Sequence, residues 1–241
     1  NSINFCRLFA FFCKFMSNFF TSNVKSFVLR SGRITSAQKR ALRDYSGFFC
    51  IPFTKKELPP EKIFGNSNPI VFDIGFGMGD EIVDFSIKNP TKNVLGIEMY
   101  KPAIGNLLKN IHDKTIKNVK IIEYDAYWVL NYMIPDESID EIHIYFPDPW
   151  PKKKHVKRRL LNEEFAKIIA RKLKNNGEIK CATDNSNYAE QIVSALGKQK
   201  YLQNMNETYG NRPKDRVFSK FEKKALSDDS KIYEISFQKL N

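Results

Sequence analysis

The spacing of apolar residues predicts alternating strands and helices from about residue 69 onwards. Short β-branched runs predict strands at Ile70–Ile74, Asn93–Glu98, Val119–Tyr124, Ile139–Phe146 and Glu178–Thr183. Segments with apolar residues at helical spacing lie between them, near Gly79–Lys88, Pro102–Asp113, Tyr127–Met133 and Asn162–Lys174. This alternation is typical of an α/β domain with a mostly parallel sheet and helices on both faces.

Residues at the ends of these segments refine the prediction. Pro102 suits the first turn of a helix and Asn162 predicts a helix N-cap. We expect Gly177 to end the helix that Asn162 begins. Further on, the pattern predicts a helix to about Gly197 and a final strand over Lys231–Lys239, which we expect to be antiparallel.

A proline-containing break at residues 58–61 predicts two parts: a basic N-terminal arm over 1–58 and one catalytic domain over 59–241. Residues 1–20 hold seven Phe, and no acidic residue precedes Asp44. Three interpretations stay open for them: a presequence, an RNA-contacting arm, or an upstream extension before a start at Met16. The uncharged run Leu8–Cys13 is too short to span a membrane, so no membrane anchor is expected.

The composition favours a polyanionic partner without establishing one. Lys and Arg number 39 against 27 Asp and Glu, giving a net charge of +12, although a general bias towards Lys could produce the same excess. The four cysteines form no CxxC pair, so neither a disulfide framework nor a metal site is expected. This fits the cytoplasm, or an organelle if the N-terminal segment is a presequence.

The segment Val71–Gly79 ends a strand and opens a helix, with glycines at Gly75, Gly77 and Gly79. Glycines there let the backbone pass close to a nucleotide-like cofactor, although a tight turn alone would explain them too. The spacing is GxGxG and no Lys-Ser/Thr follows, so this is not a P-loop.

Acidic residues follow the next two predicted strands. Glu98 is placed to accept the hydroxyls of a ribose, and Asp125 to accept an adenine amino group or to cap the next helix. Together with Asp73, which lies near the end of the first predicted strand, Glu98 and Asp125 make three acidic strand ends, and this set suits S-adenosylmethionine. A nicotinamide-dependent oxidoreductase would share the glycine turn and Glu98 but would explain neither Asp125 nor the basic residues further on.

The fourth predicted strand runs into the most distinctive stretch of the chain, Phe146-Pro147-Asp148-Pro149-Trp150 followed by six Lys or Arg between Lys152 and Arg159. Prolines stiffen the backbone around Asp148, and Trp150 offers a flat face to a base. The basic residues suit phosphates, although a solvated charge run is the ordinary explanation for such a segment. A non-catalytic RNA-binding module would explain the charge and Trp150 but not the glycine turn.

This stretch resembles the tRNA (guanine-N7-)-methyltransferases, which share a Phe-Pro-Asp-Pro-Trp turn leading into a basic tract. Four further segments are similar to that family: Ser26–Gln38, Ala182–Asp184, Arg212-Pro213 and Ser219–Glu222. The resemblance implies a Rossmann-like class I methyltransferase. It would transfer the methyl group of S-adenosylmethionine to N7 of a guanine in tRNA, in the variable loop.

The resemblance also assigns residues. It implies that Asp148 is catalytic and lines the cofactor site together with Asp73, Glu98 and Asp125. It implies that the residues facing tRNA are Lys152, Asp184, Ser219, Lys220, Phe221 and Glu222. The family commonly has Glu at Asp73, Thr at Ser219, and Arg-Gly where this chain has Lys223-Lys224-Ala225. A methyltransferase acting on another RNA stays the alternative, and the sequence is compatible with a monomer or a homodimer.

Overall fold

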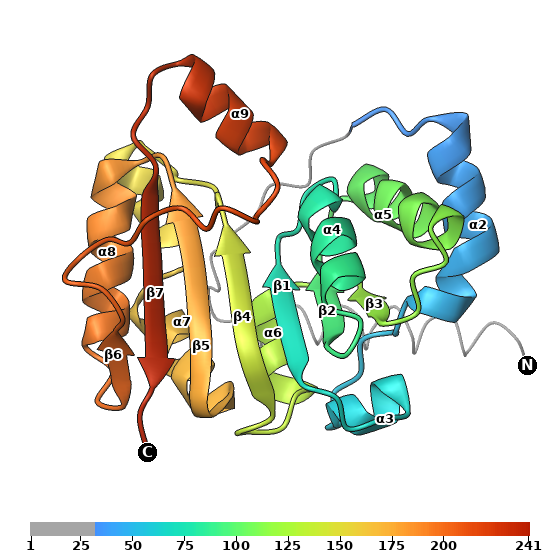
Figure 1. Cartoon of the computed structure of the whole chain (residues 1–241), viewed down its shortest axis with the longest axis horizontal. Coiled ribbons are helices and arrows are strands. Elements are labelled where there is room, and N and C mark those ends of the chain that lie inside the picture. Colours follow the sequence, from blue (N-terminus) through green and yellow to red (C-terminus); the bar gives the residue numbers. More distant parts are fainter. Residues whose placement is uncertain (1–31) are drawn as a thin grey trace, which may run out of the picture.

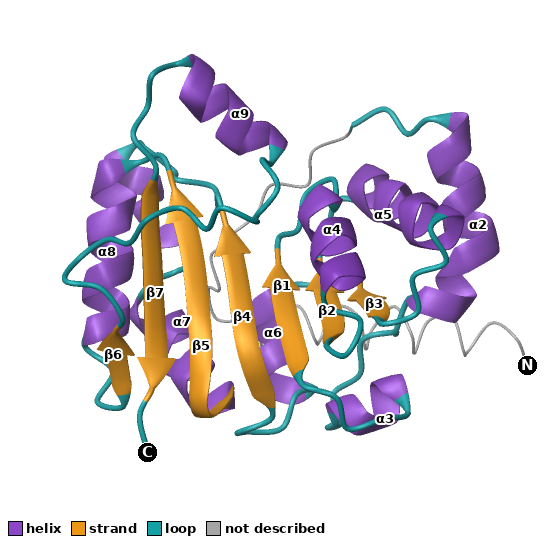
Figure 2. Cartoon of the chain, viewed as in Figure 1, coloured by secondary structure: helices purple, strands orange, loops and turns teal. Residues whose placement is uncertain are grey.

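The computed structural model describes residues 32–241, which form one seven-stranded sheet with helices on both faces (Figures 1 and 2). The strand order is β3-β2-β1-β4-β5-β7-β6. The pairs among β1 to β5 are parallel, and β7 is antiparallel to both of its neighbours. This confirms the predicted α/β class and the antiparallel C-terminal strand. The strands are β1 (Ile70–Ile74), β2 (Asn93–Ile97), β3 (Val119–Ile122), β4 (Ile139–Tyr145), β5 (Leu173–Thr183), β6 (Leu202–Asn204) and β7 (Tyr233–Lys239).

The helices form two layers because the central strands carry apolar residues on both faces. Phe72 of β1 packs in the larger core cluster with the helices of one face, and the adjacent Val71 packs with those of the other. The first layer contains α6 (Ala126–Tyr132), α7 (Glu163–Lys172) and α8 (Ser186–Gly197); the second contains α2 (Ser36–Phe49), α4 (Asp80–Lys88) and α5 (Lys101–Asp113). Short helices α3 (Pro60–Phe64), η1 (Lys153–Arg158) and α9 (Lys220–Ser227) complete the fold.

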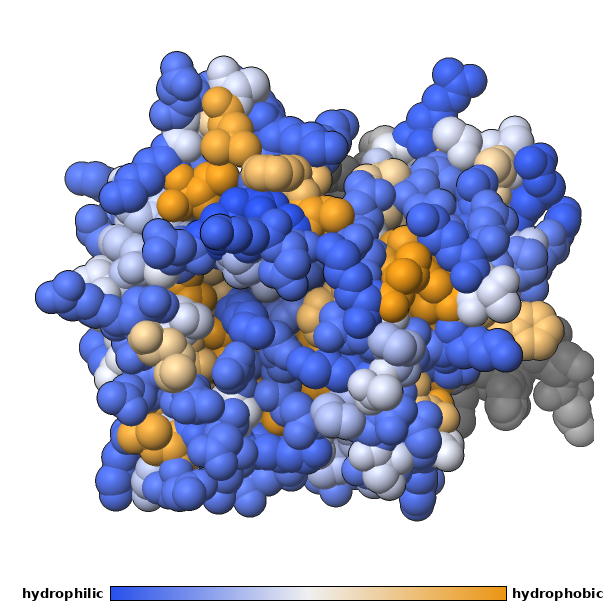
Figure 3. All heavy atoms as spheres, viewed as in Figure 1, coloured by the Kyte–Doolittle hydropathy of each residue, from blue (hydrophilic) through white to orange (hydrophobic). Residues whose placement is uncertain are grey.

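The second helix layer leaves β4, β5 and β7 uncovered on its side of the sheet (Figure 1). The strand residues that point there include Glu141, Lys180 and Ser236, and the space-filling view shows mostly hydrophilic residues over this half (Figure 3). The sheet is therefore apolar on both faces only where helices cover both faces.

The predicted elements are found, with most ends within two residues of the prediction; the clear errors are the role given to Gly177 and the start of β5. Helix α7 begins after its N-cap Asn162, as expected, but ends at Lys172 and not at Gly177. Gly177 lies inside β5, which starts at Leu173 because that residue pairs with Ile139 of β4. A β-carbon at Gly177 would lie 3.2 Å from the Asp140 carbonyl oxygen, so the glycine permits close approach of two strands.

Part of the predicted arm packs on the domain that follows it. Helix α2 begins with a capping box in which Thr35 and Gln38 bond each other's backbone amides, and Ile51 N donates to Ile121 O at 2.8 Å beside β3. The division at residue 58 stays a prediction. Residues 1–31, which include the predicted presequence and the start of the family-like segment Ser26–Gln38, lie outside the described residues. Between residues 32 and 241, no helix is long and apolar enough to cross a membrane.

We expect Gly105→Ala to loosen the contact between α2 and α5. A β-carbon at Gly105 would lie 2.9 Å from the Gln38 carbonyl oxygen, so the two helix backbones would have to separate. The free energy of unfolding, measured by urea denaturation, should fall by about 1–3 kcal/mol.

Gly47→Ala is the matched control for this substitution. Gly47 lies in α2, and its added β-carbon would have no atom within 4 Å. This variant should gain about 0.5–1 kcal/mol, since alanine favours the helix. Equal stability of the two variants would contradict the proposed close packing.

Candidate active site

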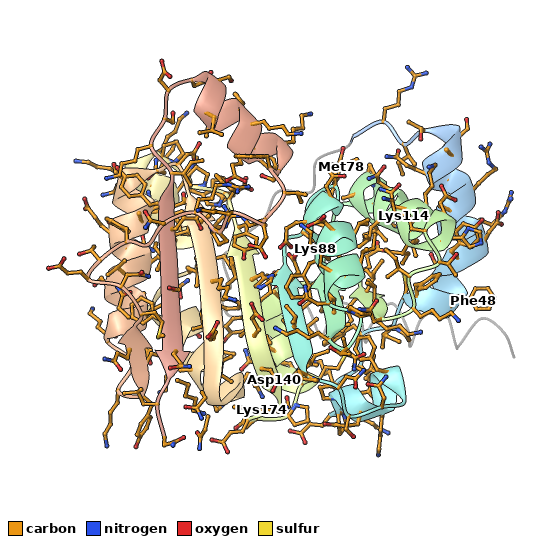
Figure 4. The ribbon with its side chains drawn as sticks, in the orientation of Figure 1. Phe48, Met78, Lys88, Lys114, Asp140 and Lys174 are labelled. Atoms are coloured by element: carbon orange, nitrogen blue, oxygen red, sulfur yellow. The ribbon has the colours of Figure 1, made fainter. Side chains whose placement is uncertain are left out.

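The predicted site residues gather along the carboxyl edge of the parallel strands, which is the upper edge in Figure 1. Parallel strands all end at the same edge, and ligands of open α/β sheets bind there. Met78, next to the glycine turn, lies at this edge, whereas Asp140 and Lys174 lie at the opposite one (Figure 4). The acidic residues that end or follow the five parallel strands are Asp73, Glu98, Asp125, Asp148 and Asp184.

The glycine turn between β1 and α4 has a backbone that requires glycine. Gly75, Gly77 and Gly79 have φ values of 74°, 54° and 81°, in the left-handed region. A β-carbon at Gly79 would lie 2.9 Å from Leu107 of α5, whereas at Gly75 and Gly77 it would have no atom within 4 Å. The turn is therefore packed against the protein at Gly79 and bordered by open space at Gly75 and Gly77, as a cofactor-binding turn requires.

Glu98 joins this turn to the end of β2. Its Oε2 accepts a hydrogen bond from Gly77 N at 3.2 Å, and its Oε1 accepts from the amides of Met99 at 2.7 Å and Tyr100 at 3.0 Å. Burial raises the pKa of Glu98, the three amides lower it, and the nearby charge of Asp148 raises it, leaving it above its ordinary value. The hydrogen bond joins Glu98 to the glycine turn, and the Asp148 charge lies close enough to influence the pKa of Glu98.

Asp125 caps α6, the structural alternative that the sequence analysis left open. Its Oδ1 accepts from Tyr127 N at 2.9 Å. Beside it, the rings of Tyr124 and Phe53 are stacked with centroids 3.8 Å apart. The sequence pattern does not predict this aromatic pair, because Phe53 falls in the predicted arm, more than sixty residues before β3. Capping fixes the orientation of Asp125, and its contact with an adenine stays a prediction.

Asp73 is buried beneath the turn, 4% exposed, within a group of charges that sequence analysis missed. A carboxylate oxygen of Asp73, one of Glu81 in the first turn of α4 and a ring nitrogen of His143 in β4 all lie within 4.8 Å of one another. His143 Nε2 lies 2.8 Å from Glu141 Oε1, and Glu141 Oε1 also accepts from Lys180 at 2.5 Å. This chain of charges crosses the uncovered half of the sheet and ends below the glycine turn.

The protonation of this group follows from its neighbours. Burial alone would lower the pKa of His143, but the Glu141 and Glu81 carboxylates raise it to about 9. Burial raises the pKa of Asp73 well above its ordinary value, and the Glu81 charge raises it further. His143 is therefore a cation at neutral pH, with Glu141 facing its Nε2 and Glu81 facing its Nδ1.

The segment around Asp148 is a strained turn. Phe146 and Trp150 have φ values of 52° and 41°, unusual for bulky residues. Phe146 N donates to Ala182 O of β5 at 2.8 Å, and Arg159 Nε donates to the Pro149 carbonyl at 2.7 Å. The prolines and these two hydrogen bonds hold Asp148 at the carboxyl edge.

The sequence predicts that all six basic residues after this turn are available to phosphates, but the structure divides them into exposed and buried residues. Lys152, Lys153, Lys154 and Lys157 are exposed around η1, and the Arg158 guanidinium lies 4.8 Å from the centre of the Trp150 ring. Arg159 is instead turned inward and 2% exposed. The prediction that all six are available to phosphates is wrong for Arg159.

The predicted substrate segment near the C-terminus, Ser219–Glu222, is also divided into exposed and buried residues. Ser219 caps α9, and Lys220 and Phe221 are exposed beside it. Glu222 is 1% exposed, and its Oε1 accepts from Arg212 at 2.6 Å and from Arg216 at 3.0 Å. The structure therefore presents Lys220 and Phe221 at the surface, while Glu222 fixes the segment that carries them.

Arg216 attaches this segment to the sheet. It bonds Glu234 of β7 through both terminal nitrogens, and its guanidinium lies 4.5 Å from the centre of the Tyr145 ring at the end of β4. Lys88 of α4 adds a bond to the Asp215 carbonyl at 2.7 Å. The segment from 212 to 222 thus crosses the sheet at the carboxyl end of β4 (Figure 1).

Comparison with known sequences identifies the type of protein. Residues 67–235 match the family model described as "Putative methyltransferase". A tRNA (guanine-N(7)-)-methyltransferase from Francisella philomiragia is 42% identical over 218 residues, covering 90% of this chain and 95% of the relative. One from Paraburkholderia xenovorans is 38% identical over 216 residues, covering 90% and 83%.

Solved structures of low identity support the fold. TrmN from Thermus thermophilus superposes with a TM-score of 0.53 at 13% identity, covering 84% of this chain and 48% of that one. The aminoglycoside resistance methyltransferase NpmB1 gives a TM-score of 0.53 at 15% identity, covering 76% and 95%. NpmB1 is a methyltransferase by name, and both superpositions agree with the Rossmann-like arrangement of the sheet.

We expect His143→Gln to destabilise the protein in a pH-dependent way. The pKa of His143 is about 9 in the folded protein, against about 6.5 in an unfolded chain, so protonation favours folding. The contribution, on the order of 3 kcal/mol, is fully present below about pH 6.5 and is lost as the pH rises through about 9. Urea denaturation of both proteins at a series of pH values measures it.

The difference in unfolding free energy between wild type and His143→Gln should therefore be widest in mild acid and narrow at alkaline pH. A difference that stays constant across this range would show that His143 is not a buried cation.

Proposed function

The chain belongs to the tRNA (guanine-N7-)-methyltransferase family, and from this premise we propose how its residues carry out the reaction. It transfers the methyl group of S-adenosylmethionine to N7 of a guanine in tRNA. The assignment of roles is supported by the hydrogen bond between Glu98 and the glycine turn, with the charge of Asp148 nearby. Exposed basic residues follow directly after the Asp148 turn. We place the target guanine in the variable loop, as the family resemblance suggests. We place the enzyme in the cytoplasm, which the free thiols of Cys50 and Cys181 support.

The carboxyl edge fits an adenosyl ligand. Open space borders Gly75 and Gly77, and Glu98 is oriented by three amides so that a ribose could share its oxygens. Asp125 would contact the adenine amino group, and Asp73 would support the turn from below. When bound, S-adenosylmethionine supplies an electrophilic methyl group on a sulfonium centre.

The nucleophile needs orientation more than activation. N7 of guanine has a lone pair and no proton, so no residue has to remove a proton before the methyl group is transferred. We assign Asp148 and Asp184 to accept hydrogen bonds from the guanine N1–H and amino group. These contacts would align the ring and offset the positive charge that N7 gains.

The exposed cations would bind the tRNA backbone around this base. Lys152 lies nearest to the Asp148 turn in sequence, and Lys153, Lys154 and Lys157 follow around η1. Lys220 and Phe221 of α9 lie across the edge and would contact the same substrate. Such contacts recognise shape and phosphates and leave base selection to the pocket.

The product identifies the reaction. Labelled S-adenosylmethionine and unmodified tRNA should give 7-methylguanosine, identified by mass spectrometry of the nucleosides. Asp148→Asn should lower the rate by about 10²-fold, because alignment and charge stabilisation at N7 both weaken. Its affinity for adenosylhomocysteine should stay near that of wild type.

Two results would contradict these assignments separately. Label in another nucleoside would reject the guanine N7 reaction itself. Full activity of Asp148→Asn with normal adenosylhomocysteine binding would reject only the charge-based role of Asp148.

Neutralising the exposed cations should weaken tRNA binding and reduce its dependence on salt. For Lys152→Ala combined with Lys157→Ala, the slope of log affinity against log salt should become shallower by about 1–2, since each phosphate contact releases counterions. Filter binding across a salt series measures this slope. Adenosylhomocysteine affinity is the control, and its parallel loss would indicate damage to the fold.

A further inference from the structure

Arg159 is the basic residue whose surroundings differ most from those of its neighbours. It is 2% exposed, although Lys152 to Lys157 and Arg158 before it are exposed or half-buried. Its Nε donates to the Pro149 carbonyl at 2.7 Å, and one terminal nitrogen donates to Asn187 Oδ1 at 2.9 Å and Gln191 Oε1 at 2.8 Å. Because these three neutral acceptors hold it inside the protein, the Arg159 guanidinium fixes the positions of the groups it bonds and is unavailable to phosphate.

The Pro149 carbonyl is a point at which the Asp148 turn needs support. The residues on either side of the Pro-Asp-Pro sequence, Phe146 and Trp150, have positive φ values. Bulky residues keep such conformations only where surrounding contacts determine them. The Phe146 end is held by its hydrogen bond to Ala182. Because proline has no N–H, the carbonyl is the backbone polar group of Pro149 that can anchor the other end.

The partners of Arg159 are themselves fixed in α8. Asn185 caps this helix by accepting from Tyr188 N at 2.8 Å. Tyr188 is fully buried, accepts from Leu161 N at 3.0 Å, and has its ring centre 4.8 Å from the Arg159 guanidinium. Gln191 also donates to the Leu161 carbonyl. Arg159 therefore ties the Asp148 turn to a rigid helix.

Helix α8 begins two residues after Asp184. The guanidinium thus connects the turn that carries Asp148 with the element that follows Asp184, the two carboxylates assigned to the guanine. Lysine could not replace it, since a single ammonium lacks the planar fork that reaches a carbonyl on one side and two amide oxygens on the other.

We propose that Arg159 is a positioning residue for methyl transfer, which sets the separation of Asp148 and Asp184 by holding the Pro149 carbonyl against α8. The proposal rests on the proposed function, because it concerns the site assigned above to guanine. It separates the basic segment into cations that bind tRNA and one that shapes the pocket.

The test compares Arg159→Lys and Arg159→Ala with Lys172→Met. Lys172 is the matched control because it is also 2% exposed and also holds a loop carbonyl, that of Ile134, at 2.6 Å. That carbonyl precedes β4 and lies away from the carboxyl edge. The measurements are kcat and KM for tRNA, adenosylhomocysteine affinity, and the melting temperature of each protein.

We expect Arg159→Lys to lower kcat by about 10²-fold, the effect of a small misplacement of reacting groups. The KM for tRNA and the affinity for adenosylhomocysteine should stay within about twofold of wild type, since Arg159 would contact neither ligand. Lys172→Met should lower the melting temperature without lowering kcat. In Arg159→Ala, guanidinium ions at tens of millimolar should restore part of kcat, and the same concentration of sodium chloride should not.

A kcat of Arg159→Lys within about twofold of wild type would overturn the proposal. An equal loss of kcat in Arg159→Lys and Lys172→Met at equal melting temperatures would also overturn it, since Arg159 would then act through stability alone. Wild-type enzyme assayed in parallel tests the proposed function separately. If wild type forms no 7-methylguanosine, the proposed function is rejected. If wild type forms it and the Arg159 variants are unaffected, only the role of Arg159 is rejected.

Discussion

Burial of the central strands on both faces is the constraint on which the site depends. All residues of β1 and β2 are buried, so polar side chains that contact a ligand are confined to the strand ends. Parallel pairing then brings the carboxyl ends of β1 to β5 to one edge. The site is therefore assembled by sheet topology from short segments scattered over more than a hundred residues.

The charges inside the sheet lie between α4 and the strands that the second helix layer leaves uncovered. Removing one partner from a buried ion pair leaves an uncompensated charge, at a cost of about 3–5 kcal/mol. His143, between Glu141 and Glu81, is such a partner, and the charge of Arg216 also lowers the pKa of Glu81. Because Arg216 in turn binds Glu222, the support beneath the glycine turn and the anchor of the C-terminal segment belong to one electrostatic system.

The sequence predicted those parts of the structure that depend on local pattern. The limits of β1 were correct, and the capping of α7 followed from Asn162 alone. Features that depend on distant contacts were missed: nothing near Gly177 in sequence reveals that it packs against the Asp140 carbonyl. Helix α2 lay within the predicted arm although its capping box at Thr35 and Gln38 is visible in the sequence. The site assignments themselves came from family resemblance, because spacing cannot show which carboxylates share a pocket.

Arg158 and Arg159 show why a run of charge cannot be interpreted from composition. Helix η1 ends at Arg158, and the extended backbone of Arg159, with φ −58° and ψ 130°, turns the chain inward. One guanidinium then covers the Trp150 ring and the next enters the protein to reach the Pro149 carbonyl. Contacts of the first kind are screened by salt, whereas a buried hydrogen-bonded cation is screened much less. Two adjacent arginines thus make separable contacts, one with the Trp150 ring and one with the backbone of the turn that carries Asp148.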